Sequence, residues 1–291
     1  STVILGLTVT SLIITKKTYK SSHILLDTFI LVVPVLVGSF ILFLPFYIDF
    51  NTQVSGVLPV REVSTRPLHF LIVWGLFLVL GISFLFKQLP RLSWNEDKGL
   101  IGLIFAIILI PVFLWAALEM FLSSFEYAET ALTGLPTVTG LRSGFLSVVS
   151  KFGKIVPGLV VVGLALYSAV RSSQRSGLIH LTVPLLLLAV GVYLIVGAEL
   201  FRLADVFNNR MNTVFKLYYQ AWIFLAIACS YGLYYLLSRW DTDKLFKKVT
   251  KYLWLACVVV LIMGSVYYVP GAVLSKLSLN TTPTLDGLAF I

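Results

Sequence analysis

The residues best suited to chemistry lie between Glu199 and Gln220, where polar side chains interrupt long apolar runs. Glu199, Arg202 and Asp205 are spaced three residues apart, so they share one face if a helix continues past residue 201. Two interpretations of this spacing stay open. The side chains form a local salt-bridge ladder, or Glu199 and Asp205 are catalytic carboxylates that Arg202 holds for a divalent metal ion or a substrate.

A second polar set enters the next apolar run. Asn212 is a good N-cap for a helix, Arg210 sits just before that helix, and Lys216 lies one turn into it. A helix N-terminus with two cations beside it favours phosphate binding. The alternative is that Lys216 snorkels to the membrane surface while Arg210 binds a lipid headgroup. The predicted substrate- or phosphate-binding residues are Arg202, Arg210, Asn212, Lys216, Tyr219 and Gln220.

The second polar set forms a stripe along the predicted helix. Its members are at positions i, i+4, i+7 and i+8, and they therefore share one helix face: Asn212, Lys216, Tyr219 and Gln220. Snorkelling accounts for Lys216 alone and leaves the two amides unexplained. Lysine and glutamine are costly inside a bilayer and usually face a cavity or a partner there. The acids Glu119, Glu126 and Glu129, by contrast, favour a solvated amphipathic face. No Walker loop, GxSxG or CxxC motif is present.

The composition sets the protein class. Of the 291 residues, 58% are hydrophobic and only 12% are charged, and the mean hydropathy is +0.96. These values exclude a soluble globular enzyme, a disordered tail and a disulfide scaffold, and they predict an all-α, polytopic transmembrane helix bundle. The net charge of +9 then reflects lysines and arginines in the loops, which set the topology and contact membrane lipids. No binding of nucleic acid is expected.

Apolar runs locate the membrane helices. Runs long enough to span a bilayer cover 24–48, 68–87, 99–121, 155–171, 179–201, 214–237 and 250–270. Pro111 is expected to kink the third of these. A shorter run at 2–15 is expected to be the end of a truncated first helix. Since the chain also ends within an apolar phrase, we expect residues 1–291 to be one transmembrane domain of a longer protein and the rest of that protein to be a partner.

Lysine and arginine counts predict the orientation. Alternate loops, starting with the one after run 2–15, hold 13 of these residues, and the opposite loops hold 9. The positive-inside rule places the first set in the cytoplasm. Residues 50–67, 122–154, 202–213 and the C-terminal tail are then outside. Within them, 122–154 has the pattern of an outward interfacial amphipathic segment, broken at Gly134-Leu135-Pro136.

A family resemblance rests on the run 205–222, DVFNNRMNTVFKLYYQAW. This run resembles the signature of the YYY-domain membrane proteins of Chloroflexi and Archaea. The stretches 71–78, 45–47 and 283–287 look like the same family. The resemblance implies a prokaryotic plasma membrane protein similar to the GT-C glycosyltransferases, which use polyprenyl-phosphate sugars at the outward face.

The same resemblance implies roles for residues. An acidic residue in the first outward loop usually has the catalytic or metal-binding role in GT-C enzymes, and the matching N-terminal part is absent from this chain. Here Arg210 and Lys216 would grip phosphate, while Glu199 or Asp205 would orient a metal ion or the acceptor. The alternatives from other classes are a carrier or flippase of an anionic lipid or solute and a non-catalytic membrane scaffold.

Overall fold

The computed structural model describes most of the chain from residue 33 to residue 278. The described residues are 33–34, 37–38, 40–49, 54–60, 65–89, 94–132, 139–175, 178–207, 209–240 and 244–278. The predicted run 2–15, much of the run 24–48, the break at 134–136 and the tail from 279 lie outside them.

The elements are helices with one short two-stranded sheet. In chain order they are α3 (Leu44–Asp49), β1 (Gly56–Pro59), α4 (Pro67–Gln88), α5 (Trp94–Leu132), α6 (Thr139–Gln174), the 3₁₀ turn η1 (Ile179–Leu181), α7 (Thr182–Leu200), β2 (Phe201–Ala204), α8 (Met211–Ser238) and α9 (Leu245–Ser278).

The predicted all-α, polytopic membrane fold is confirmed. Among the described residues, six segments are long and apolar enough to cross a membrane: Pro67–Gln88, Lys98–Leu122, Val149–Gln174, Ile179–Leu200, Met211–Ser238 and Leu245–Ser275. They correspond to the last six predicted runs. Pro67 at the first helical position of α4 and Lys87 in its last turn suit the two ends of that helix.

The predicted interfacial segment 122–154 is largely helical. Helix α5 continues to Leu132, and α6 begins at Thr139, well before the apolar run that starts at residue 155. Its placement at the membrane interface stays a prediction. Both helices extend beyond their apolar runs, and the predicted break at 134–136 falls among residues 133–138, which lie between them in the chain and outside the described part.

The condition under which Glu199, Arg202 and Asp205 would share one helix face is not met, because helix does not continue past residue 201. Phe201–Ala204 forms β2, which pairs antiparallel with β1, so that Leu58 faces Arg202 and Gly56 faces Ala204. Backbone bonds extend the pairing on both sides, from Ser55 N to Ala204 O and from Val60 N to Leu200 O, each 2.8 Å. The strand partner lies about 145 residues earlier in the chain, so no local spacing reveals it.

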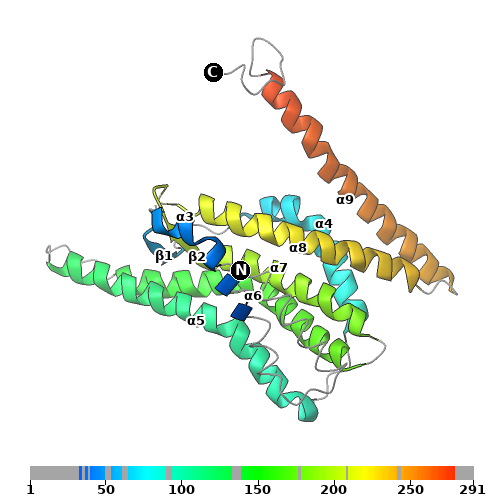
Figure 1. Ribbon diagram of the computed structural model, residues 1–291, viewed down its shortest axis with the longest axis horizontal. Helices are drawn as coiled ribbons and strands as arrows, with labels where there is room; N and C mark the ends of the chain where they lie inside the picture. Colours follow the sequence, from blue (N-terminus) through cyan, green and yellow to red (C-terminus); the bar gives the residue numbers. More distant parts are fainter. Residues whose placement is uncertain are drawn as a thin grey trace.

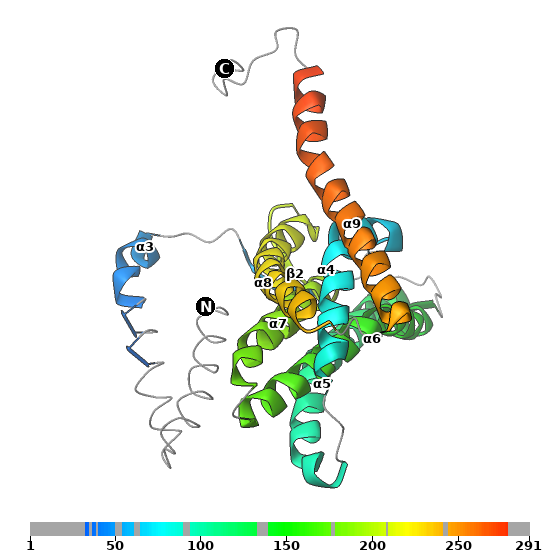
Figure 2. The ribbon, with the colours of Figure 1, turned by 90° about the vertical axis from the view of Figure 1, so that its right-hand side faces the viewer.

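Helices α4, α6, α7 and α8 form the centre of the bundle, and α5 packs on the outer side of α6 (Figure 1). The main core lies between α4, α7 and α8 and includes Trp74, Phe84, Leu185 and Leu225. A second core, around Trp115, joins α5, α6 and the end of α7. Figures 1 and 2 show β1 and β2 at the end of the bundle where α8 begins, and the second half of α9 extending away from it.

A proline inside α5 is compensated from a neighbouring helix. Pro111 has no N–H to donate to the carbonyl of Ile107, four residues earlier. The hydroxyl of Tyr193, on α7, donates to that carbonyl at 2.8 Å. Figure 1 shows that α5 changes direction along its length, as expected for a proline within it. Tyr193 therefore satisfies a backbone group that the bilayer would leave without a partner.

We expect Tyr193→Phe to lower the free energy of unfolding by about 1 kcal/mol, because the Ile107 carbonyl loses its donor. SDS titration of the folded protein measures this change. In a Pro111→Ala background the same substitution should cost much less, since residue 111 then donates its own N–H. Equal costs in the two backgrounds would show that Tyr193 does not replace the missing helix bond.

Candidate functional site

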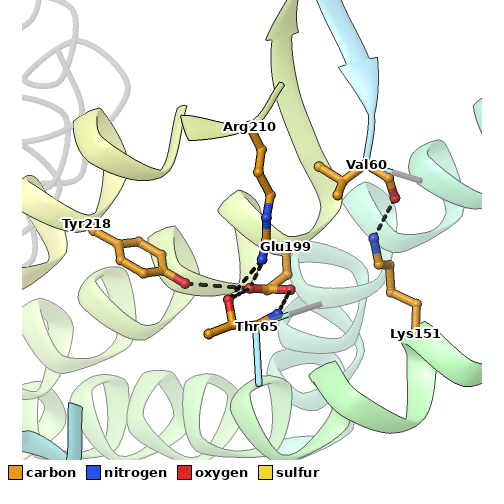
Figure 3. A network of polar contacts seen from close by, with 6 residues as sticks. All are labelled: Val60, Thr65, Lys151, Glu199, Arg210 and Tyr218. Atoms are coloured by element: carbon orange, nitrogen blue, oxygen red, sulfur yellow. Dashed lines mark hydrogen bonds and ion pairs between the residues drawn. The ribbon is translucent and has the colours of Figure 1, made fainter. Parts of the chain in front are cut away.

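The site is built where α7 ends and α8 begins. Glu199 is the penultimate residue of α7, β2 follows it directly, and Arg210 immediately precedes α8. The bonds between β1 and β2 hold Val60 beside the end of α7, and Thr65 lies two residues before α4. Residues from three separate parts of the sequence thereby meet around one carboxylate (Figure 3).

The Glu199 carboxylate accepts hydrogen bonds from three residues. Thr65 donates its hydroxyl to Oε1 at 2.5 Å and its backbone N–H to Oε2 at 3.3 Å. Arg210 forms an ion pair with Oε1 at 3.0 Å and donates a second N–H to the Thr65 hydroxyl at 3.1 Å. The Tyr218 hydroxyl lies 3.5 Å from the same Oε1. The Glu199 and Arg210 side chains are only 11% and 17% exposed, so water screens this pair weakly.

A buried lysine holds the other side of the site. Lys151 is 4% exposed and donates from Nζ to the carbonyl of Val60, the residue after β1. The same ammonium lies over the Trp115 ring, 5.5 Å from its centroid, which is a cation–π geometry. Val60, fully buried, also donates its N–H to Leu200 O. Lys151 thus links α6 to the residue that follows β1.

Asp205 belongs to a second, separate network. Its two carboxylate oxygens accept the backbone N–H of Phe207 at 3.1 Å and the side-chain amide of Asn212 at 2.7 Å. The prediction that Asn212 caps α8 is wrong: it lies inside the helix, and the side chain of Asn209 accepts the N–H of Met211 at 2.8 Å. Asn212 instead ties the first turn of α8 to the turn that follows β2.

The other predicted residues are spread over α8 and β2. Lys216 and Tyr219 are exposed, and Gln220 is half-buried. Arg202 lies in β2, so Glu199, Arg202 and Asp205 do not form the helical ladder that their spacing suggested. Glu199 pairs with Arg210 instead. A substrate-binding role for Arg202, Lys216, Tyr219 and Gln220 stays a prediction.

The structure adds residues that local sequence patterns did not single out. Thr65 lies 134 residues from Glu199, and Lys151 looked like one more loop positive. Glu119 is only 4% exposed, so the expectation of a solvated face is wrong for this acid. The available signal was a charge within an apolar run, since Lys151 and Glu119 both lie inside membrane-spanning segments.

The donor set does not suit a divalent metal ion. No three His, Cys, Asp or Glu side chains within the described ranges gather as metal ligands would. The Glu199 carboxylate already accepts hydrogen bonds from Thr65, Arg210 and Tyr218, and one of these partners is a cation. An anion fits these surroundings better than a cation does.

An apolar cavity of about 350 Å³ reaches this network from the bundle interior. Its walls come from α4, α6, α7 and α8, and its lining includes the charged residues Glu199 and Lys154. The Trp74 side chain also lines it, is 1% exposed, and has no hydrogen-bond partner for its indole N–H among the described residues. The cavity therefore offers apolar walls and a charged end.

Comparison with known proteins defines the family. The family model described as "Uncharacterized membrane protein (DUF2298)" matches residues 2–225, which include β1, β2 and the whole network around Glu199. Neither the curated proteins nor the solved structures contain a match. Because the matched region is more than half of the chain, the protein belongs to the DUF2298 family of membrane proteins.

Proposed function

We propose that the protein is a membrane glycosyltransferase that takes a sugar from a polyprenyl phosphate, as the GT-C enzymes that the sequence resembles do. The observation that carries the proposal is the apolar cavity whose lining ends in Lys154 and Glu199, next to Arg210. A polyprenyl-phosphate sugar is amphipathic and suits this arrangement. Its apolar chain would occupy the cavity, and its phosphate would bind the cations.

Arg210 is the proposed phosphate ligand. A guanidinium has five N–H donors, and the bonds to Glu199 and Thr65 use two of them. Glu199 and Thr65 therefore fix the orientation of Arg210 and leave donors for a phosphate oxygen. Lys154, exposed and one turn after Lys151, supplies a second cation on the same side of the cavity.

The chemistry of transfer requires a base and a stabilised leaving group. The acceptor hydroxyl attacks the anomeric carbon, the bond from that carbon to the phosphate oxygen breaks, and the hydroxyl proton passes to the base. The departing polyprenyl phosphate gains negative charge, which Arg210 stabilises. Asp205 is the better base, since Glu199 is bound to a guanidinium whereas Asp205 accepts only amide N–H groups in the described contacts.

The test is transfer in proteoliposomes. The purified protein is reconstituted with a polyprenyl-phosphate hexose carrying a radiolabelled sugar, together with a membrane extract from cells that lack the protein as the source of acceptors. We expect the label to leave the polyprenyl phosphate only when the protein is present. Movement of intact labelled lipid between leaflets would identify a carrier instead. If the label stays on the polyprenyl phosphate and the lipid does not move between leaflets, the non-catalytic scaffold is the remaining alternative.

We infer that the site faces the outside of a prokaryotic plasma membrane, because the lysine and arginine count places residues 202–213 there. Val206 is 77% exposed, so Val206→Cys should react with an impermeant thiol reagent added to whole cells. The background needs Cys257→Ser, since Cys257 is exposed, whereas Cys229 is buried and can stay. Labelling only after the cells are opened would reverse the orientation.

A further inference from the structure

The strongest unassigned feature is a basic pocket at the other end of the bundle. It has a volume of about 430 Å³ and is lined by Ser83, Phe86, Lys87, Leu236, Trp240 and Lys247. Lys87 lies in the last turn of α4, whereas Pro67 is the first residue of that helix and lies near the Glu199 network. Twenty residues of helix separate these ends by about 30 Å, the thickness of a bilayer core. The pocket is therefore distinct from the proposed transfer site.

Three helices contribute to this pocket, and a tryptophan pair fixes their relation. Trp254, on α9, donates its indole N–H to the Ser83 hydroxyl at 2.9 Å. Its ring lies 5.4 Å from that of Trp240, between centroids. Ser83 accepts this bond and keeps its own O–H proton for another acceptor. Paired tryptophans at a helix end are typical of the membrane–water interface, which is where lipid headgroups lie.

The charge around the pocket is positive. Residues 239–251 hold five lysines and arginines and two aspartates. Lys87 and Lys247 are both exposed and line the pocket from different helices. An ammonium is a point charge that binds phosphate well without strict geometry. Phe86, 67% exposed, and Leu236 supply an apolar wall beside these cations.

We propose that this pocket binds the phosphate headgroup of an anionic membrane phospholipid. The cations and the Ser83 hydroxyl hold the phosphate, and the first part of the lipid lies against Phe86 and Trp240. Basic pockets between transmembrane helices bind lipids in this way. The bound lipid would bridge α4 and α8 to α9, whose first half makes the described contacts to α4 while its second half extends from the bundle (Figure 2).

The test is equilibrium binding of phosphatidylglycerol to the purified protein in a neutral detergent. We expect Lys87→Gln and Lys247→Gln each to weaken binding about fivefold, since a lysine near a membrane surface contributes on the order of 1 kcal/mol to attraction of an anionic lipid. Lys98→Gln is the matched control, because Lys98 is an exposed lysine in the first turns of α5, at the same end of the bundle, and does not line the pocket.

Two further arms identify the ligand. Phosphatidylcholine, which has the phosphate but no net charge, should bind weakly. The two lysine substitutions should not change its affinity. Inorganic phosphate should not displace phosphatidylglycerol at equal concentration. Displacement would show a free-anion site and overturn the assignment to a lipid. Unchanged phosphatidylglycerol affinity in a folded Lys87→Gln, Lys247→Gln double variant would overturn the pocket itself.

Discussion

Arg210→Ala is expected to lower the free energy of unfolding by about 3 kcal/mol, as removing one partner of a buried ion pair does. The substitution leaves the Glu199 carboxylate, 11% exposed, with hydrogen bonds from Thr65 and Tyr218 but without a neutralising cation. SDS titration in mixed micelles measures the loss. If Arg210 also binds the donor phosphate, transfer should fall by about a hundredfold or more.

A double variant separates the buried charge from the lost contacts. Glu199→Gln keeps an oxygen for Thr65 and Tyr218 but carries no charge, so Arg210→Ala should cost less in that background. Arg239→Ala is the matched control, because Arg239 follows the other end of α8, is exposed, and lies over the Tyr235 ring at 5.8 Å. It should cost under about 1 kcal/mol. Equal costs for Arg210 and Arg239 would refute the buried pair.

The membrane helices were predictable because a single physical quantity sets them. A bilayer core demands about 20 apolar residues per span, and six of the predicted runs coincide with described spans to within a few residues at most ends. The largest difference is at the start of the span Val149–Gln174, where Lys151 made the apolar run appear to begin at residue 155. This lysine is tolerated inside the span because Val60 and Trp115 provide partners.

The centre of the site was predictable only in part. The sequence singled out Glu199 and Arg210, because charges beside apolar helices are rare. It did not pair them, since the spacing of Glu199 to Arg202 suited a helix that the structure replaces with β2. Strand pairing with residues 56–59 decides the conformation there. Nothing in the local sequence distinguishes Thr65 from other threonines. It lies beside Glu199 only because of this long-range pairing.

The apolar cavity could not be predicted at all, because it depends on which helix faces meet. Gly158 lies where an added Cβ would come within 2.9 Å of Val196 Cγ2, so α6 and α7 approach closely there. Gly158 and Val196 both line the cavity, so this close approach forms part of its wall. Apolar periodicity in a membrane helix does not distinguish a face that packs from one that lines a cavity.

Lys151→Met is the second substitution with a large expected effect, and it tests how the site is held in place. Methionine has nearly the same length but cannot donate to the Val60 carbonyl, which lies in a fully buried residue. A buried acceptor without a donor costs about 1–3 kcal/mol. This cost should fall on the β1–β2 pairing, because Val60 continues β1 and donates to Leu200.

Hydrogen exchange of the backbone amides locates that cost. The N–H groups of residues 56–58, of Val60 and of residues 201–204 should exchange at least about tenfold faster in Lys151→Met, since local opening becomes easier by more than 1 kcal/mol. Amides in the middle of α7, packed in the main core, should change little. Lys154→Met is the matched control, because Lys154 is exposed on the same helix and should leave exchange in the two strands unaltered.

The pattern of the two measurements assigns the role of Lys151. As a positioning residue it acts through Val60 and the β1–β2 pairing, so Lys151→Met should loosen the strands. Lys151→Arg, which retains a donor and the charge, should restore much of their protection. A lysine that binds donor phosphate directly would instead leave strand exchange unchanged and raise the donor concentration needed for half-maximal transfer. Because its Nζ already bonds Val60 and lies over Trp115, we expect the first pattern.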